Sequence, residues 1–166
     1  ETIIEKTAYI YRKAEERGLI RGRTISGMVT AAIYIACREI ETPRTLKEIA
    51  TISNIKRKNI ALCCRLLIRE LDLKVPIADP MKCIVKIANK ANLSEKITRQ
   101  AMNIMTEVVK RGISAGKNPM SFAATVLYIS SFKNGENVRQ SDIAKAAGIT
   151  EVTLRNRIKE LNSTVL

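Results

Sequence analysis

An internal repeat constrains the fold of this chain more than any other feature of its sequence. Laid over itself with a shift of 94 residues, the chain matches positions 1–60 to positions 95–154 without a gap. Glycines such as Gly18 and Gly112 coincide, and so do apolar pairs such as Tyr34 and Tyr128. Beyond this stretch Glu70 matches Glu160, a shift of 90 residues, so the first copy carries about one extra helical turn. The sequence therefore predicts two copies of one structural unit.

Inside each copy the apolar residues recur with the period of a helix. The segment from Ile25 to Ile40 is apolar nearly all round, like its counterpart from Pro119 to Phe132, which is typical of a helix at the centre of a bundle. Thr45 and Glu48 have capping-box spacing, which predicts the start of a third helix, and a fourth is expected from about Arg57 to Leu71. Because alternating strand patterns are absent from the sequence, we expect an all-α fold. The predicted core-facing residues of the first helix are Ile3, Ile4, Thr7, Ala8, Tyr11 and Ala14.

The segment from Asp72 to Pro80, with prolines at 76 and 80, is typical of a linker. We therefore place the first repeat in residues 1–75 and the second in residues 76–166. A further short helix is expected from Met81 to Ala91, and it has no counterpart before Glu1. The first repeat is thus expected to lack its opening helix, and the chain is expected to be a fragment.

The charge of the chain narrows its possible functions. A formal net charge of +13, from 29 Lys and Arg against 16 Asp and Glu, favours a polyanionic partner. Since the sequence has no His, it excludes His-based catalytic triads and His metal ligands, and no other residue constellation suggests an enzyme. The longest apolar run is far shorter than the about 20 residues that cross a membrane, and no signal peptide is visible. We expect a binding protein that is neither secreted nor membrane-spanning, with its four cysteines reduced.

The strongest motif is a helix-turn-helix pattern from Gln140 to Leu161. Ala144 and Gly148, four residues apart, allow close helix approach and a sharp turn. The outward residues of its second helix would meet DNA in the major groove, where Arg155 suits guanine and Val152 suits a thymine methyl. An ordinary helical hairpin remains the alternative. The outward set comprises Glu151, Val152, Thr153, Arg155, Asn156 and Lys159, of which Thr153, Asn156 and Lys159 are candidates for backbone contacts.

The first copy contains a degraded version of this motif from Thr45 to Leu71, with Asn54 at the turn. Its second helix begins with the basic patch Lys56, Arg57 and Lys58, which suits phosphates better than bases, although a solvated helix end is an equal alternative. Few aromatic side chains are present, so duplex DNA is favoured over stacked single strands. Two glycine loops are further candidates for backbone contacts, or plain turns: Arg21, Gly22 and Arg23, and Ala115, Gly116, Lys117 and Asn118.

Two blocks in order resemble the core of transcription initiation factor B, the archaeal TFB and eukaryotic TFIIB family. The first block is GRTISGMVTAAIYIACR (22–38) followed by PRTLKEIA (43–50), and the second is PMSFAATVLYI (119–129) followed by AGITEVTLR (147–155). The resemblance covers essentially the whole chain. It implies two cyclin-like helical repeats that bind the TATA-binding protein on double-stranded promoter DNA and help to recruit RNA polymerase.

The same resemblance implies which residues contact DNA. The family's base-reading Val and Arg map onto Val152 and Arg155, which would read an element upstream of the TATA box. Its downstream minor-groove loop maps onto residues 21–23. The resemblance also implies the cytoplasm of an archaeon or the nucleus of a eukaryote, and tandem unequal repeats favour a monomer.

The chain also departs from this family. The zinc ribbon and the segment that enters the polymerase are not in this sequence, so no cofactor is expected in this fragment. Arg139 stands where relatives often place a capping Thr, which leaves the start of that helix less well defined.

Two rival functions remain. A cyclin-type protein-binding adaptor would share the helical repeats without sequence-specific DNA binding. A stand-alone helix-turn-helix repressor would bind a palindrome as a homodimer.

Overall fold

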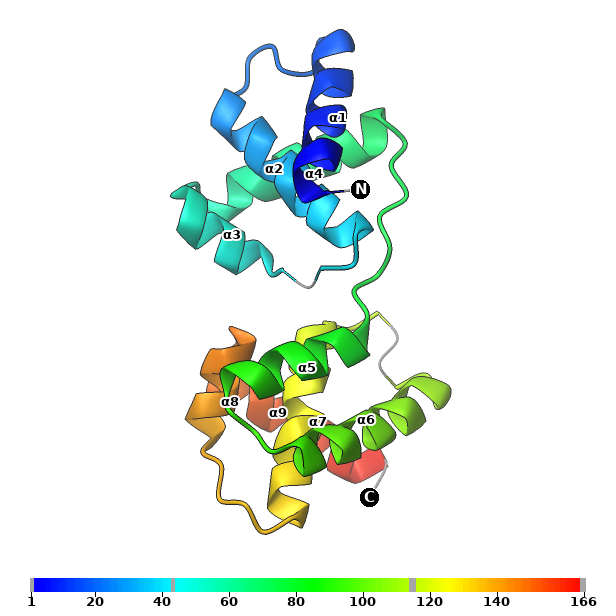
Figure 1. Ribbon diagram of the computed structural model, residues 1–166, viewed down its shortest axis with the longest axis vertical. Helices are drawn as coiled ribbons and strands as arrows, with labels where there is room; N and C mark the ends of the chain where they lie inside the picture. The colour runs from blue at the N-terminus through cyan, green and yellow to red at the C-terminus, as the bar shows by residue number, and fades with distance from the viewer. Residues whose placement is uncertain (1, 43, 114–115, 165–166) are drawn as a thin grey trace. The chain divides into compact units, whose positions relative to one another are not determined.

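The structure, a computed structural model, describes residues 2–42, 44–113 and 116–164, and every regular element in these ranges is an α-helix (Figure 1). The prediction of an all-α, cyclin-like chain is confirmed. The chain divides into two compact units, Glu1–Ile77 and Ala78–Leu166. No helix among the described residues is long and apolar enough to span a membrane.

The described part of the first unit contains four helices, and that of the second contains five. The helices of the first unit are α1 (Ile3–Glu16), α2 (Ile25–Glu39), α3 (Leu46–Ser53) and α4 (Arg57–Glu70). Those of the second unit are α5 (Pro80–Lys90), α6 (Glu95–Lys110), α7 (Pro119–Lys133), α8 (Gln140–Ala147) and α9 (Glu151–Thr164). The repeat pairs α1 to α4 with α6 to α9 in order. Helix α5 has no counterpart in the described part of the first unit, as the sequence predicts.

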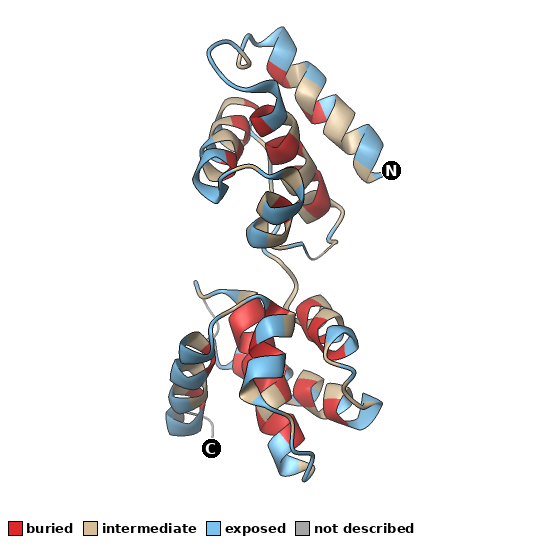
Figure 2. Cartoon of the chain, turned by 90° about the vertical axis from the view of Figure 1, so that its left-hand side faces the viewer, coloured by how far each residue is buried: buried red, intermediate tan, exposed pale blue. Residues whose placement is uncertain are grey.

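The most apolar helix of each unit lies at its centre. Helix α2 packs against α1, α3 and α4, and α7 packs against α5, α6, α8 and α9. Figure 2 shows the consequence, since buried residues cover most of both helices. Fully buried Ile35 and Phe122 anchor these centres, and burial of one such side chain contributes about 1.5–3 kcal/mol.

The core-facing side of α1 differs from the prediction at two residues, Ile4, which was predicted to face the core, and Ile10, which was not. Ile4 is 81% exposed, whereas Ile10 is fully buried. Because successive helical residues turn by about 100°, Ile10 shares the inward stripe with Ile3, Thr7 and Ala14, while Ile4 lies on the flank. Predicting Ile4 in the core was therefore wrong.

Side-chain caps fix where most of these helices begin. The capping box predicted at Thr45 is present, and Asn118 caps α7 ahead of Pro119 through its Oδ1, which accepts from the Met120 backbone N at 2.9 Å. Asp79 caps α5 ahead of Pro80 in the same way, so this helix begins one residue before the predicted start.

The segment between the units is attached to the core at either end. Leu73 and Val75 pack against the first core, and Ala78 packs against the second. Arg38 Nη2 donates to the backbone carbonyl of Pro76 at 2.6 Å. Between these anchors lies Ile77, whose side chain is 87% exposed.

Candidate nucleic-acid interface

Helices α8 and α9 form the helix-turn-helix of the second unit. Gly148 has φ +68°, a left-handed conformation that disfavours residues with a Cβ. This geometry lets the Ile149 backbone N donate to the Ala144 carbonyl at 3.0 Å, which closes α8. Thr150 Oγ1 accepts from the Thr153 backbone N at 3.2 Å and caps α9.

Helix α9 has one buried face and one solvent face. Leu154 and Leu161 are buried in the core of the second unit. The opposite face exposes Val152, Arg155, Asn156 and Lys159, and Val152 is 63% exposed although it is apolar. An apolar side chain held in water at the start of a solvent-facing helix is suited to contact a base edge.

Thr153 is less available to DNA than the sequence predicts. Its side chain is partly buried, and its Oγ1 lies 2.8 Å from Thr150 Oγ1. The hydroxyl therefore completes the cap of α9.

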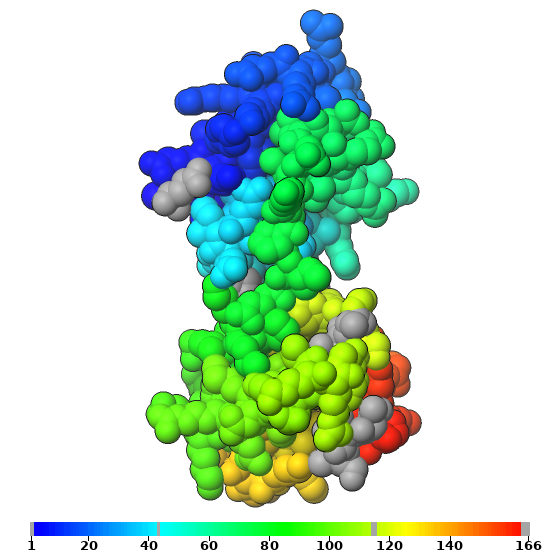
Figure 3. Space-filling view, turned by 90° about the vertical axis from the view of Figure 1, so that its right-hand side faces the viewer, coloured from blue at the N-terminus to red at the C-terminus, as the bar shows by residue number. Residues whose placement is uncertain are grey.

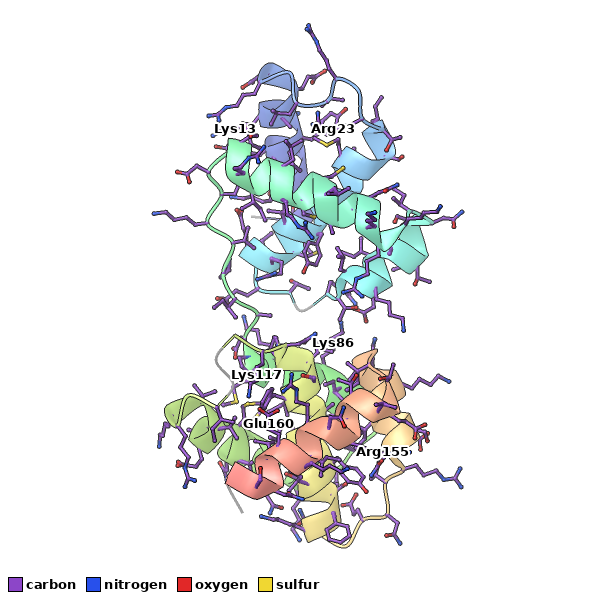
Figure 4. All side chains as sticks on the ribbon, turned by 180° about the vertical axis from the view of Figure 1, so that it is seen from behind. Lys13, Arg23, Lys86, Lys117, Arg155 and Glu160 are labelled. Carbon is purple, nitrogen blue, oxygen red and sulfur yellow. The ribbon has the colours of Figure 1, made fainter. Side chains whose placement is uncertain are left out.

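Arg155 is exposed and is held by two side chains (Figure 4). Its Nε donates to Gln140 Oε1 at 3.1 Å, and its Nη2 pairs with Glu151 Oε2 at 3.0 Å. The guanidinium thus stands on the solvent face of α9 in a defined position. A guanidinium can chelate the O6 and N7 of guanine through two parallel hydrogen bonds.

Lys117 does not present a free charge to solvent. It forms an ion pair with Glu160, which also pairs with Arg157 on the same helix (Figure 4). Both cations lie over the ring of the buried Phe122, at 5.6 Å for Lys117 Nζ and 5.4 Å for Arg157 Cζ. Hydrogen bonds from Lys117 and Arg157 lower the pKa of Glu160. Lys117, which we predict to contact DNA, ties the loop before α7 to α9 in this structure, and its contact with DNA stays a prediction. Ala115 of the same loop lies outside the described residues.

The matching loop of the first unit is exposed. Gly22 has φ +75°, and Arg21 and Arg23 are both solvent-accessible. Arg23 Nη1 donates to the backbone carbonyl of Leu19 at 2.9 Å, so its guanidinium folds over its own loop. Arg21 extends a cationic side chain next to a glycine that allows close backbone approach.

The helix-turn-helix of the first unit keeps the turn geometry of the second. Asn54 adopts φ 54°, ψ 31° where Gly148 stands in the second unit. Lys56, Arg57 and Lys58 are all exposed at the start of α4, and no side-chain cap forms there. Three exposed cations at the positive end of a helix suit phosphate groups.

An open groove of about 780 Å³ lies between the start of α2 and the length of α4. Arg23, Arg65 and Arg69 line it above the apolar side chains of Leu62 and Leu66. At the far end of α4, Arg17 of α1 donates to the carbonyl of Glu70, and Figure 3 shows the green end of α4 beside the blue α1.

Sequence reasoning missed Arg65, Arg69 and Gln140. The two arginines are four residues apart on one helix, a spacing that could have placed them on one face. Gln140 begins the helix-turn-helix motif, but its contact with Arg155 joins residues 15 apart and has no periodic signal.

No group of three or more potential metal-ligating side chains occurs among the residues that the structure describes. Burial raises the pKa of the Cys64 thiol to about 12 and that of the Cys83 thiol to about 11.

Comparison with known proteins gives consistent matches. The model of the transcription factor TFIIB repeat family matches residues 1–70 and 73–164. Transcription initiation factor IIB of Pyrobaculum islandicum is 46% identical over 162 residues, which are 98% of this chain and 49% of that protein. Its namesake in Saccharolobus shibatae is 47% identical over 161 residues, 97% of this chain and 53% of that protein. Transcription initiation factor IIB of Pyrodictium occultum is 45% identical over 159 residues, which are 96% of this chain and 51% of that protein. The chain thus spans about half the length of the curated relatives it matches.

Proposed function

The chain belongs to the transcription factor TFIIB repeat family, and from this membership we propose that it forms the two-repeat core of a transcription initiation factor. In this role it binds the TATA-binding protein on double-stranded promoter DNA and helps to recruit RNA polymerase. It acts by binding rather than by catalysis. The archaeal relatives favour the cytoplasm, and a single chain with two unequal repeats favours a monomer.

The observation that carries this proposal is the solvent face of α9. Arg155 and Val152 stand there beside one another in a capped helix whose other face is buried. In helix-turn-helix proteins this part of the second helix enters the major groove. We propose that Arg155 reads guanine and Val152 contacts a thymine methyl in DNA upstream of the TATA box. Asn156 and Lys159 on the same face contact the adjoining backbone, whereas Thr153 and Lys117 act through the cap and the ion pair described above.

Contacts to phosphates supply most of the affinity. Arg21, Gly22 and Arg23 approach the minor groove downstream of the TATA box, and the basic patch at residues 56–58 contacts the backbone. Each phosphate neutralised releases counterions, so binding must weaken as salt rises. These residues strengthen binding to all duplexes, and the preference for one sequence comes from α9.

Fluorescence anisotropy on promoter duplexes tests the proposal. Duplexes with the native upstream flank and with a scrambled flank are titrated with and without the TATA-binding protein. Arg155→Ala should lower the preference for the native flank by about 1–3 kcal/mol, or about 5- to 150-fold. Arg99→Ala is the matched control, because Arg99 forms the same exposed i,i+4 pair with Glu95 at the start of α6.

Two outcomes would contradict the proposal. If binding depends neither on the TATA-binding protein nor on the flank sequence, the positive charge serves a generic nucleic-acid-binding surface. Indifference to DNA altogether would favour the protein-binding adaptor.

A further inference from the structure

A chain of hydrogen bonds runs behind Arg155 into the second unit. Arg155 Nε on α9 donates to Gln140 Oε1 at 3.1 Å. Gln140, the first residue of α8, donates in turn through Nε2 to the Tyr128 hydroxyl of α7 at 3.2 Å. Tyr128 and Gln140 are both partly buried, whereas Arg155 is exposed. Three helices thus contribute to the position of one guanidinium.

The chemistry of the three groups gives this chain a direction. A guanidinium can only donate, so the amide of Gln140 must turn its oxygen toward Arg155. Its NH₂ group is then left to face the Tyr128 oxygen, which can accept. The hydroxyl of a half-buried tyrosine on the central helix α7 accepts from this NH₂ group, so it anchors the amide whose orientation Arg155 sets.

Gln140 differs from the other partner of Arg155. Glu151 pairs with Arg155 across one helical turn, with both side chains largely exposed, and solvent and salt weaken such pairs. Glu151 also carries a negative charge that DNA phosphates repel. Gln140 is neutral, so it can keep its bond to Arg155 beside a polyanion.

The first repeat provides an internal comparison. At the shift of 94 residues, which holds for positions 1–60, Leu46 stands in the place of Gln140. Tyr34 corresponds to Tyr128, but its hydroxyl accepts from Arg38 Nη1 of its own helix at 3.4 Å. The amide therefore has no equivalent at the matching position of the first repeat, and the matching tyrosine has a different partner there.

We propose that Gln140, anchored by Tyr128, is a positioning residue that holds Arg155 ready to read a base. This inference rests on the function proposed above, because it assigns a role within the same site. A side chain that is ordered before binding loses less conformational freedom on binding, so the native flank is favoured more strongly. Gln140 acts through Arg155 and therefore affects the choice of sequence.

A double-mutant cycle in the complete chain tests this role. Gln140→Met keeps the length of the side chain and removes the amide. With the TATA-binding protein present, anisotropy gives the ratio of affinities for a promoter duplex with its native upstream flank and one with that flank scrambled. Gln140→Met should lower this ratio about three- to tenfold in the wild-type background and leave it unchanged in the Arg155→Ala background.

A pair of tyrosine variants supplies the matched control. Tyr128→Phe removes the hydroxyl that accepts from Gln140 and should lower the same ratio by a smaller factor. Tyr34→Phe removes the equivalent hydroxyl from the first repeat and should leave the ratio unchanged. Circular dichroism of each variant excludes loss of folding as the cause.

The outcomes separate the two proposals. If Arg155→Ala removes the flank preference while Gln140→Met preserves it, the positioning role is wrong and the proposed function stands. If Gln140→Met lowers the ratio equally in both backgrounds, Gln140 acts independently of Arg155 and the positioning role is again wrong. If Arg155→Ala does not change the preference, base reading by α9 fails, and the positioning role fails with it.

Discussion

Thr45 and Arg139 occupy equivalent positions at the start of the helix-turn-helix in each repeat, but only Thr45 caps its helix with its side chain. Thr45 Oγ1 accepts from the Glu48 backbone N at 3.1 Å, and Glu48 Oε2 accepts from the Thr45 backbone N at 2.8 Å. Arg139 is the N-cap of α8 and forms no side-chain cap hydrogen bond. Arg139→Thr should therefore raise the free energy of unfolding of the second unit.

The size of the gain follows from two local contributions. A side-chain oxygen at the N-cap is worth about 1 kcal/mol. Removing a cation from the positive end of a helix adds about 0.3–1 kcal/mol. The return bond would come from Asp142, which is one methylene shorter than Glu48, so we take little from it. The expected sum is about 1–2 kcal/mol, and each kcal/mol raises the Tm of a unit of this size by about 4–8 °C.

Two experiments measure the change in the free energy of unfolding. Hydrogen exchange is followed separately in each unit, and circular dichroism follows thermal unfolding of the chain. Arg139→Thr should slow exchange throughout α8 and α9, and the reciprocal Thr45→Arg should accelerate it in α3 and α4. Arg139→Ala removes the charge without supplying a cap, so it isolates the electrostatic part. Equal stability of Arg139→Thr and Arg139→Ala would refute the capping argument.

Three further predictions concern other residues. Gly148→Ala should lower the free energy of unfolding by about 1 kcal/mol, because a Cβ in the left-handed conformation costs about 1–2 kcal/mol and the stiffer unfolded chain offsets part of it. Gly148→Asn should lower it less, since Asn54 adopts the same conformation, and equal urea midpoints for the two variants would contradict this. Because the pKa of Glu160 is lowered in the folded protein, its ion pairs add stability above the unfolded pKa, and this stability is lost as the pH falls through the folded pKa. The urea midpoints of wild type and Glu160→Gln should therefore converge below about pH 4, and a gap that stays constant with pH would refute the ion-pair role. Iodoacetamide at pH 8 should modify the half-buried Cys63 before Cys64, because burial raises the pKa of Cys64 to about 12. Equal modification rates at the two cysteines, measured by mass spectrometry, would contradict this prediction.

Local sequence signals were enough to predict most of the fold. The capping pattern at Thr45, the proline after Asn118 and the all-round apolar segments each act within a few residues, and each predicts its element correctly. The left-handed turn at Asn54 was also predicted, because few residues other than Gly and Asn adopt it easily.

Contacts between distant residues set the limit of prediction at the site. The sequence gives Lys117 a charge and an exposed loop, but its pairing with Glu160 joins residues 43 apart, and only the packing of α9 brings them together. The contact of Gln140 with Arg155 depends on the folded turn in the same way. The prediction for Ile4 was wrong for a different reason: the residue is apolar, like those of the core, but it lies on the flank of the helix and its side chain is exposed.

The anchored segment between the two repeats affects how much conformational entropy the chain loses when both repeats bind one partner. Leu73, Val75 and Ala78 are already packed, and the Pro76 carbonyl is already bonded, which leaves the backbone around Ile77. Fixing one residue of backbone costs about 1–2 kcal/mol, so two repeats that grip one molecule lose far less than they would on a long flexible tether. Once either repeat has bound, the other is confined near the same molecule at an effective concentration of about millimolar or above. Under the function proposed above, two repeats that each bind weakly would in this way hold a promoter as a single avid ligand.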